Sequence, residues 1–309
     1  MIDQPTTLDR ALGVMLGLAC GDALGAPVEF ESRVAITARY PDGLRDFTTG
    51  GWLSVERGEL TDDSRMAIDL AEVLIIPGLP DMEALADRFV AWVAEDPKDV
   101  GNTTRLAIGH LAAGVPWQEA GAMALATMGS SHAASNGSIM RTAPVAVRFA
   151  HQPEQLIRAS LDTSRITHAE PRCQWSSVAY NQALAHLLNG GEIDSMLEAA
   201  DTSIDDRDVR AAIAAIPNLQ EKDLRGTGFV LNALQIALWA VRTQPTLEEA
   251  IVSAVMVGDD TDTNAAVTGA LAGARWGAAA IPGRWLDLLQ QRERLTSLAE
   301  SLFAASQSA

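Results

Sequence analysis

The chain has few cysteines and few basic residues for its 309-residue length, and each shortage excludes a class of protein. Its two cysteines, Cys20 and Cys173, have no paired spacing, so we expect no disulfide framework and a reducing compartment. The 23 basic residues face 40 acidic ones, and the net charge of −17 argues against nucleic acid or an anionic membrane as the main partner. An anionic small substrate stays compatible, because bound divalent ions would reverse the local sign of the charge.

A signal sequence and a long apolar run are also missing from the N-terminal region. Residues Met1 to Pro5 lack the positive charge of a signal peptide, so we expect none. The longest clean apolar run nearby, Ala11 to Cys20, is too short to span a bilayer. We expect a cytoplasmic protein without a membrane partner, and we expect it to act as a monomer.

No stretch shows a convincing period-two alternation of apolar and polar residues, so we expect no sheet. Helical spacing is common instead, and a helix over residues 8–20 would place five apolar side chains on one face: Leu8, Leu12, Met15, Leu16 and Ala19. Neither a low-complexity linker nor a repeat of solenoid period divides the chain. We therefore predict an all-α fold in a single domain, residues 1–309.

A glycine recurs at every fourth position from Gly13 to Gly25. Glycine costs about 1 kcal/mol inside a helix, so this ridge predicts close packing against another backbone or the approach of a ligand. Residues 21–30 predict a loop in which Asp22 is solvated and Glu29, between two apolar residues, is partly buried. Residues 31–60 predict a long surface loop.

Two acidic clusters, about 200 residues apart, carry the chemistry. One is Thr61-Asp62-Asp63-Ser64, and the other is Gly258-Asp259-Asp260-Thr261-Asp262-Thr263-Asn264. Each opens a predicted helix, so simple helix capping is one interpretation. Carboxylates packed this densely repel one another unless a cation holds them. Because the ligands would all be oxygen, the cation should be hard: Mg²⁺, Mn²⁺ or Ca²⁺.

Known motifs of similar composition do not fit. An EF-hand loop would need glycine at Ala265 and glutamate at Leu271. A terpene-synthase box would need aspartate at Met66, and no His-Asp dipeptide of a phosphohydrolase occurs. If both clusters bind metal, the aspartates are ligands and a separate carboxylate must move protons; Glu29 and Asp99 are the candidates.

Taken in order, the motifs resemble those of the ADP-ribosylglycohydrolase family over nearly the whole chain. Besides the two clusters, they include Gly21-Asp22-Ala23-Leu24-Gly25 with Glu29, Asp99-Val100-Gly101-Asn102-Thr103-Thr104, Asn136-Gly137-Ser138-Ile139-Met140-Arg141, Thr167-His168 and Gly228-Phe229-Val230. The resemblance implies an orthogonal all-α bundle with a dinuclear Mg²⁺ or Mn²⁺ site.

The resemblance also implies residue roles. The metal ligands would be Thr61, Asp62, Asp63, Asp260, Asp262 and Thr263. Asp99 matches the acid of the arginine-directed branch, and Glu29 matches a glutamate near the metals that is the base in the serine-directed branch. Contacts to ADP-ribose would come from Asn102, Thr103, Thr104, Asn136, Gly137 and His168, with Phe229 stacking on adenine.

The activity implied is metal-dependent hydrolysis that removes ADP-ribose from a modified protein, by cleaving its N-glycosidic bond to arginine. Ala133 and Ala134 stand where some relatives carry serine and an aromatic residue, which argues against the serine-directed branch. The open alternatives are a hydrolase of serine-linked ADP-ribose, of O-acetyl-ADP-ribose or of a modified nucleic-acid base, and a non-catalytic ADP-ribose-binding protein.

Overall fold

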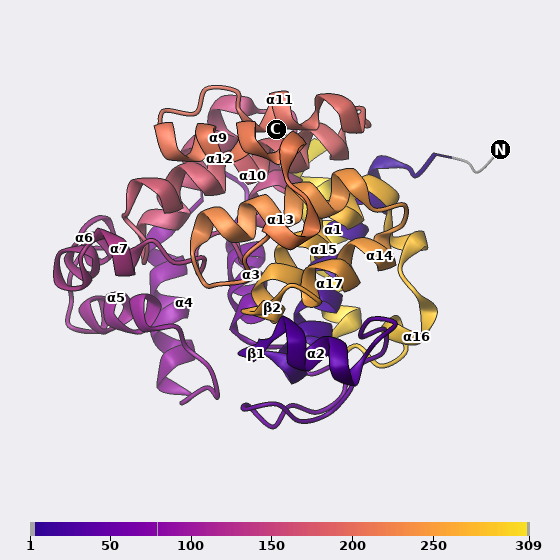
Figure 1. Ribbon diagram of the computed structural model, residues 1–309. Helices are drawn as coiled ribbons and strands as arrows, with labels where there is room; N and C mark the ends of the chain where they lie inside the picture. Colours follow the sequence, from indigo (N-terminus) through magenta and orange to yellow (C-terminus); the bar gives the residue numbers. More distant parts are fainter. Residues whose placement is uncertain (1–3, 79, 308–309) are drawn as a thin grey trace.

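The computed structural model of the chain describes residues 4–78 and 80–307. Helices make up most of them, which confirms the predicted helical class (Figure 1). The α-helices are α1 (Thr7–Gly25), α2 (Arg33–Arg39), α3 (Asp62–Leu74), α4 (Met82–Ala94), α5 (Asn102–Ala112), α6 (Trp117–Met128), α7 (Ser130–Ala133), α8 (Ala143–Phe149), α9 (Pro153–Arg165), α10 (Pro171–Leu188), α11 (Met196–Ala200), α12 (Arg207–Ala215), α13 (Val230–Thr243), α14 (Leu247–Val255), α15 (Thr261–Trp276), α16 (Gly283–Leu286) and α17 (Arg292–Gln307). The shorter elements are the 3₁₀ turns η1 (Ala26–Val28), η2 (Ile193–Ser195), η3 (Ile216–Asn218), η4 (Glu221–Asp223) and η5 (Ala278–Ala280), and the strands β1 (Glu31–Ser32) and β2 (Gly258–Asp259).

Helices α1 and α15 lie side by side at the centre of the molecule (Figure 1). Helices α13 and α14 pack against α15, and α17 packs against α1. Helices α4, α5 and α6 form a neighbouring group at one side, and β1, β2 and α2 lie together at one edge (Figure 1). The centre is therefore built from the two ends of the sequence.

The glycine ridge of α1 packs directly against the backbone of α15, which confirms its predicted close-packing role. A Cβ atom on Gly17 would clash with the carbonyl of Gly269, and a Cβ atom on Gly21 would clash with the carbonyl of Ala265. The two helices run antiparallel, because Gly13 faces Gly273 while Gly25 faces the first turn of α15. This contact places the N-terminus of α15, and with it the second acidic cluster, beside the C-terminal end of α1.

Helix α1 also accounts for the most apolar segment of the chain. Residues Thr7–Val28 are long enough to cross a membrane, and an 18-residue window within them has a mean hydropathy of 1.6, but 94% of that window is buried inside the structure. This apolar segment is longer than the run from Ala11 to Cys20 that was identified from the sequence. Its burial is explained by the packing of α1 against α15 and α17 in the core.

Two predictions about residues 21–60 are wrong. Residues 21–25 continue α1 rather than forming a loop, because the tight contact with α15 offsets the helix cost of the glycines. Residues 31–39 form β1 and α2 rather than a continuous loop, and Ser32 caps α2 by accepting a hydrogen bond from the backbone N–H of Ala35 at 3.3 Å.

A small sheet is present where none was expected. Strand β1 pairs antiparallel with β2, with Glu31 opposite Asp259 and Ser32 opposite Gly258. Strands of two residues are too short to produce a visible alternation in the sequence. The sheet joins the segment after Glu29 to the residues just before the second acidic cluster.

Candidate metal centre and substrate loops

Asp22 organises the first acidic cluster from within α1. Its carboxylate accepts hydrogen bonds from the Thr61 N–H at 3.1 Å, the Thr61 hydroxyl at 2.9 Å and the Ser64 N–H at 3.2 Å, and also from the Ser64 hydroxyl. The side chain is fully buried. These four donors belong to the N-terminus of α3, so Asp22 acts as a cap from a different helix. The expectation that Asp22 is solvated is wrong.

The two acidic clusters meet at Asp63. One of its carboxylate oxygens, Oδ2, accepts hydrogen bonds from the hydroxyl of Thr61 at 3.4 Å and from the hydroxyl of Thr263 at 3.3 Å. The other oxygen, Oδ1, is buried and has no hydrogen-bond partner among the described residues. A buried carboxylate oxygen without a donor is costly unless a cation lies against it.

The N-terminus of α15 is fixed by its own set of contacts. The Thr261 hydroxyl donates to the carbonyl of Gly25 at 2.8 Å, and the Asp260 N–H donates to the carbonyl of Gly226 at 2.9 Å. The Thr263 N–H donates to the carboxylate of Asp262 at 2.9 Å. The Thr261 hydroxyl therefore links the start of α15 to the end of α1.

The two predicted proton-transfer residues lie at the same centre. Single oxygens of Glu29, Asp99 and Asp262 lie within 4.8 Å of one another, close enough to surround one ion. Asp99 also shares a hydrogen bond with Asp62. Glu29 is held from the other side by Trp52, whose indole N–H donates to its carboxylate at 2.6 Å.

Burial and mutual repulsion keep these acids from ionising easily. Burial is the largest cause in each case, and it raises the pKa of Glu29 to about 8 and of Asp22 to about 6. It also raises the pKa values of Asp62, Asp63 and Asp262 well above their ordinary range, and neighbouring carboxylates raise them further. A divalent cation would reverse this effect, so the donor set fits hard metal ions.

The segment Ser135–Gly137 forms a loop that contacts the residues just before α13. Ser135 makes a bridge with Phe229, and the Asn136 N–H donates to the carbonyl of Gly228 at 3.0 Å. The Asn136 amide donates to the carboxylate of Asp260 at 3.0 Å. One predicted substrate residue thus also orients one predicted metal ligand.

A second set of predicted substrate residues packs behind this loop. A Cβ atom on Gly137 would meet the ring of His168 at 2.8 Å and the hydroxyl of Thr104 at 3.2 Å. The ring nitrogens of His168 face the hydroxyls of Thr167 at 2.7 Å and Ser135 at 2.9 Å. Burial lowers the pKa of His168 well below its ordinary value, so the ring is neutral. The ring supports the loop, and its direct contact with a ligand stays a prediction.

Thr103 joins the same network, and Asn102 stands outside it. The Ser135 hydroxyl donates to the hydroxyl of Thr103 at 3.3 Å, and both Thr103 and Thr104 are buried. Asn102 is exposed at the first position of α5. Phe229 is half-buried, and the guanidinium of Arg172 lies 5.4 Å from its ring centroid.

Arg141 is a buried cation that sequence reasoning did not assign to the site. Its guanidinium donates to the carbonyl of Gly137, to the carbonyl of Thr163 at 3.0 Å and to the hydroxyl of Thr167 at 2.7 Å. It also lies 5.1 Å from the ring centroid of Phe89. Arg141 ties the Ser135–Gly137 loop to the end of α9.

The residues that sequence reasoning missed are Asp22, Trp52, Ser135, Arg141 and Arg172. A charged residue inside an otherwise apolar helix, as at Asp22, could have been recognised, because such a residue needs a partner. The role of Trp52 has no sequence signal, since its contact with Glu29 depends on the fold.

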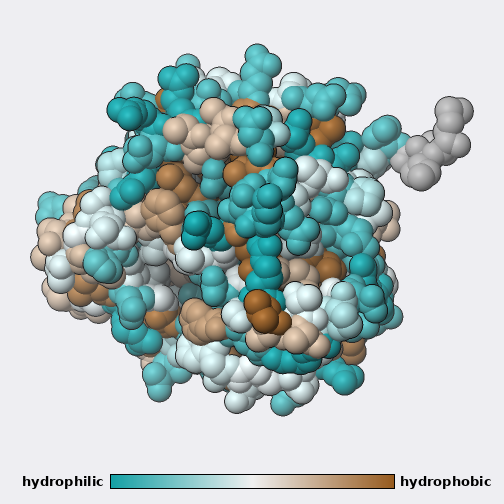
Figure 2. Space-filling view, viewed as in Figure 1, coloured by the Kyte–Doolittle hydropathy of each residue, from teal (hydrophilic) through white to brown (hydrophobic). Residues whose placement is uncertain are grey.

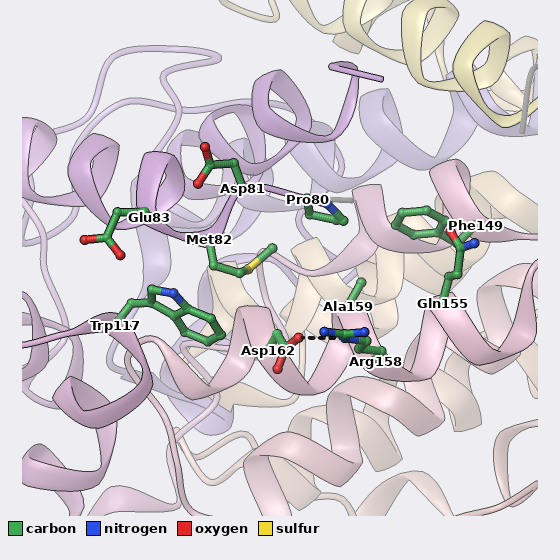
Figure 3. A pocket seen from close by; sticks show the side chains of 10 residues that line it. All are labelled: Pro80, Asp81, Met82, Glu83, Trp117, Phe149, Gln155, Arg158, Ala159 and Asp162. Atoms are coloured by element: carbon green, nitrogen blue, oxygen red, sulfur yellow. Dashed lines mark ion pairs between the residues drawn. The ribbon is translucent and has the colours of Figure 1, made fainter. Parts of the chain in front are cut away.

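Two surface cavities lie away from the candidate centre. One of about 270 Å³ lies between the start of α4 and α9, where Met82 and Trp117 face the Arg158–Asp162 ion pair (Figure 3). A larger one of about 1070 Å³ is lined by residues from the start of α1, the end of α10 and the end of α15. Neither includes any of the predicted site residues.

Comparison with known proteins agrees with this geometry. The sequence model of the family described as ADP-ribosylglycohydrolase matches residues 3–309. The chain is 33% identical to "ADP-ribosylarginine hydrolase Tri1" of Serratia proteamaculans, covering 98% of this chain and 81% of that protein. It is 32% identical to "ADP-ribosyl-[dinitrogen reductase] glycohydrolase" of Rhodospirillum rubrum, covering 93% of this chain and 92% of that protein.

A solved structure shows the same fold. The chain matches a protein in the structure titled "ADP-ribosylglycohydrolase-related protein complex" with a TM-score of 0.82 and 33% identity, covering 97% of this chain and 99% of that one. The motifs, the fold and the sequence matches agree over almost the whole length. The chain belongs to the ADP-ribosylglycohydrolase family and is a glycosyl-bond hydrolase of that family.

Proposed function

We propose that the protein removes ADP-ribose from modified proteins by hydrolysing its N-glycosidic bond to arginine. The observation that carries the proposal is the meeting of two acidic clusters, 200 residues apart, at the Thr263–Asp63 contact, with Asp99 and Glu29 beside them. Two similar proteins bear names that point to the same linkage or activity: an ADP-ribosylarginine hydrolase and a glycohydrolase of ADP-ribosylated dinitrogen reductase.

The activity would depend on two Mg²⁺ or Mn²⁺ ions. The buried, partnerless Oδ1 of Asp63 and the raised pKa values of the surrounding acids support such a site. The residues that would hold the ions are Thr61, Asp62, Asp63, Asp260, Asp262 and Thr263. Ions bound there would bind the two ribose hydroxyls and would lower the pKa of water, so that it becomes a better nucleophile.

The protein's own carboxyl groups would move the protons. Asp99 would take a proton from the water whose oxygen forms the new bond to the anomeric carbon. The bond from that carbon to the guanidine nitrogen breaks, and the departing nitrogen takes a proton from Glu29. Glu29 lies within 4.8 Å of Asp99 and Asp262, so both proposed proton-transfer groups lie at the same centre.

The loops beside the acids would hold the ADP part of the substrate. Backbone N–H groups at Gly101, before α5, and at Gly137 would bind the pyrophosphate without a basic patch. Phe229 would stack on adenine, and its ring is already fixed by Arg172. Fixing both ends of the substrate would align the anomeric carbon with the acids.

Serine-linked ADP-ribose is the second candidate substrate. Glu29 favours it, because its carboxylate reaches within 4.8 Å of both Asp262 and Asp99 and could serve as the base. Release of free ADP-ribose from an arginine-modified protein and from a serine-modified peptide, both in Mn²⁺, separates the two candidates. We expect release from the arginine substrate only. Release from the serine peptide alone would overturn the arginine assignment.

A further inference from the structure

Phe30 and Trp52 form an exposed aromatic pair beside the candidate centre. Phe30 is 64% exposed and Trp52 is 51% exposed, although both are large apolar side chains. Their ring centroids lie 5.4 Å apart with an angle of 40° between the planes. Apolar surface also appears in the space-filling view over the region where β1 and α2 lie (Figure 2). Adjoining exposed aromatic side chains are a feature of protein interaction surfaces.

The backbone holds both rings outward. Phe30 adopts a left-handed conformation with φ of 63°, which is strained for an aromatic residue, and its N–H donates to the carbonyl of Asp259 at 2.6 Å. Trp52 lies on a turn closed by a bridge between Gly50 and Val55.

The turn that carries Trp52 is itself anchored. Leu53, within the turn, and Val55, at its end, are buried in a small cluster with Ala26. The turn is fixed by its neighbours while the Trp52 ring remains outside. Both rings are thus exposed on backbone segments that hydrogen bonds and packing hold in place.

The aromatic pair borders the candidate centre through Glu29. The indole N–H of Trp52 donates to the Glu29 carboxylate, and Glu29 lies within 4.8 Å of both Asp99 and Asp262. In the proposed reaction Glu29 gives its proton to the departing nitrogen. A ring held against Glu29 therefore lies near the group from which ADP-ribose is released.

We propose that Phe30 and Trp52 form the surface on which the ADP-ribosylated polypeptide docks, contacting the residues that flank its modified arginine. The net charge of −17 favours basic flanking residues in that polypeptide, and aromatic rings suit both their apolar stems and their cationic ends. This inference rests on the proposed function, because it takes the released group to be part of a protein.

Two substrates with the same bond and different leaving groups test the proposal. One is an arginine-modified protein, and the other is ADP-ribosyl-agmatine, which has the guanidine but no polypeptide. The variant is Phe30→Asn, since asparagine tolerates the left-handed conformation and lacks the ring. The matched control is Val34→Gln on α2, where a neighbouring exposed apolar residue is replaced. Phe30→Gly is a second variant that keeps the backbone conformation.

We expect Phe30→Asn to lower kcat/KM about tenfold for the modified protein, through KM, because aromatic anchors carry much of the binding at such surfaces. Turnover of ADP-ribosyl-agmatine and both activities of Val34→Gln should stay at the wild-type level. An equal loss on both substrates, or no loss on either, in folded Phe30→Asn and Phe30→Gly would overturn the docking surface.

Two other results, a dimeric wild-type protein and an inactive one, would be told apart from a failed docking surface. Sedimentation that shows a wild-type dimer and a monomeric Phe30→Asn would assign the rings to a second copy of the chain and overturn the proposal. A wild-type protein that hydrolyses neither substrate would overturn the proposed function itself, and the docking surface with it.

Discussion

At the scale of single residues, the proposed metal ligands are positioned by hydrogen bonds with other polar residues. Asp22 is not one of the proposed metal ligands, yet its carboxylate accepts hydrogen bonds from both Thr61 and Ser64 and so positions the start of α3. Asn136 does the same for Asp260. The residues named by motif are therefore kept in position by residues whose type alone does not reveal their role.

Asp99→Asn tests the proposed base. The amide keeps the size of the side chain and cannot accept a proton from water, so kcat should fall by about 10²-fold or more. The measurement is ADP-ribose release from the arginine-modified protein at saturating substrate. Asp96→Asn is the control, because Asp96 is an exposed residue of the same turn with a φ of 53° that asparagine tolerates. Full turnover by Asp99→Asn would remove Asp99 from the proton transfer.

At the scale of elements, the contact between α1 and α15 brings the acidic clusters together. The glycine spacing correctly predicts that another backbone lies close to α1. The sequence does not identify α15 as that partner, because any helix with small residues would fit the same ridge. The hydrogen bond from the Thr261 hydroxyl to Gly25 depends on this choice of partner. The capping of α3 by Asp22 depends in the same way on the packing of α1 against α3, which the sequence does not identify either.

Gly17→Ala tests the importance of that contact. A methyl group there would clash with the backbone carbonyl of Gly269, which cannot move aside as a side chain could. We expect a loss of about 1–3 kcal/mol in the free energy of unfolding, measured by denaturant titration. Gly109→Ala on the exposed side of α5 is the control, since nothing lies within 4 Å of its Cβ position. That variant should gain up to about 1 kcal/mol from helix propensity. Equal stability of the two variants would contradict the packing argument.

At the scale of the whole molecule, motifs predict the helical class, and the fold brings distant motifs together. The starts of α3 and α15 meet where Thr263 contacts Asp63, and Asp99, just before α5, lies within 4.8 Å of Asp262 and Glu29. The small β1–β2 sheet and the aromatic pair were not predictable. Strands of two residues carry no periodic signal, and the exposure of Phe30 and Trp52 depends on the turns that hold them.

The acidic centre should make the stability of the metal-free protein depend on pH. The folded-state pKa values of Glu29 and Asp22 are raised to about 8 and about 6, above the values of roughly 4 for unfolded chains. The folded protein therefore binds more protons in this interval, and its stability should fall as the pH rises from about 4 to about 8.

Thermal unfolding in EDTA at about pH 5 and about pH 8 measures this dependence. We expect a lower Tm at the higher pH in EDTA, and we expect added Mn²⁺ to raise the Tm most at the higher pH, where the acids ionise most readily. A metal-free Tm that rises with pH over this interval would contradict the assigned charge state of the centre.

The most direct test of the central claim is the rate of ADP-ribose release from an arginine-modified protein before EDTA treatment, after it, and after Mn²⁺ or Mg²⁺ is restored. We expect release to stop in EDTA and to return with the metal, and we expect Asp262→Asn to abolish this recovery. Undiminished release in EDTA would contradict a metal centre built from the two acidic clusters.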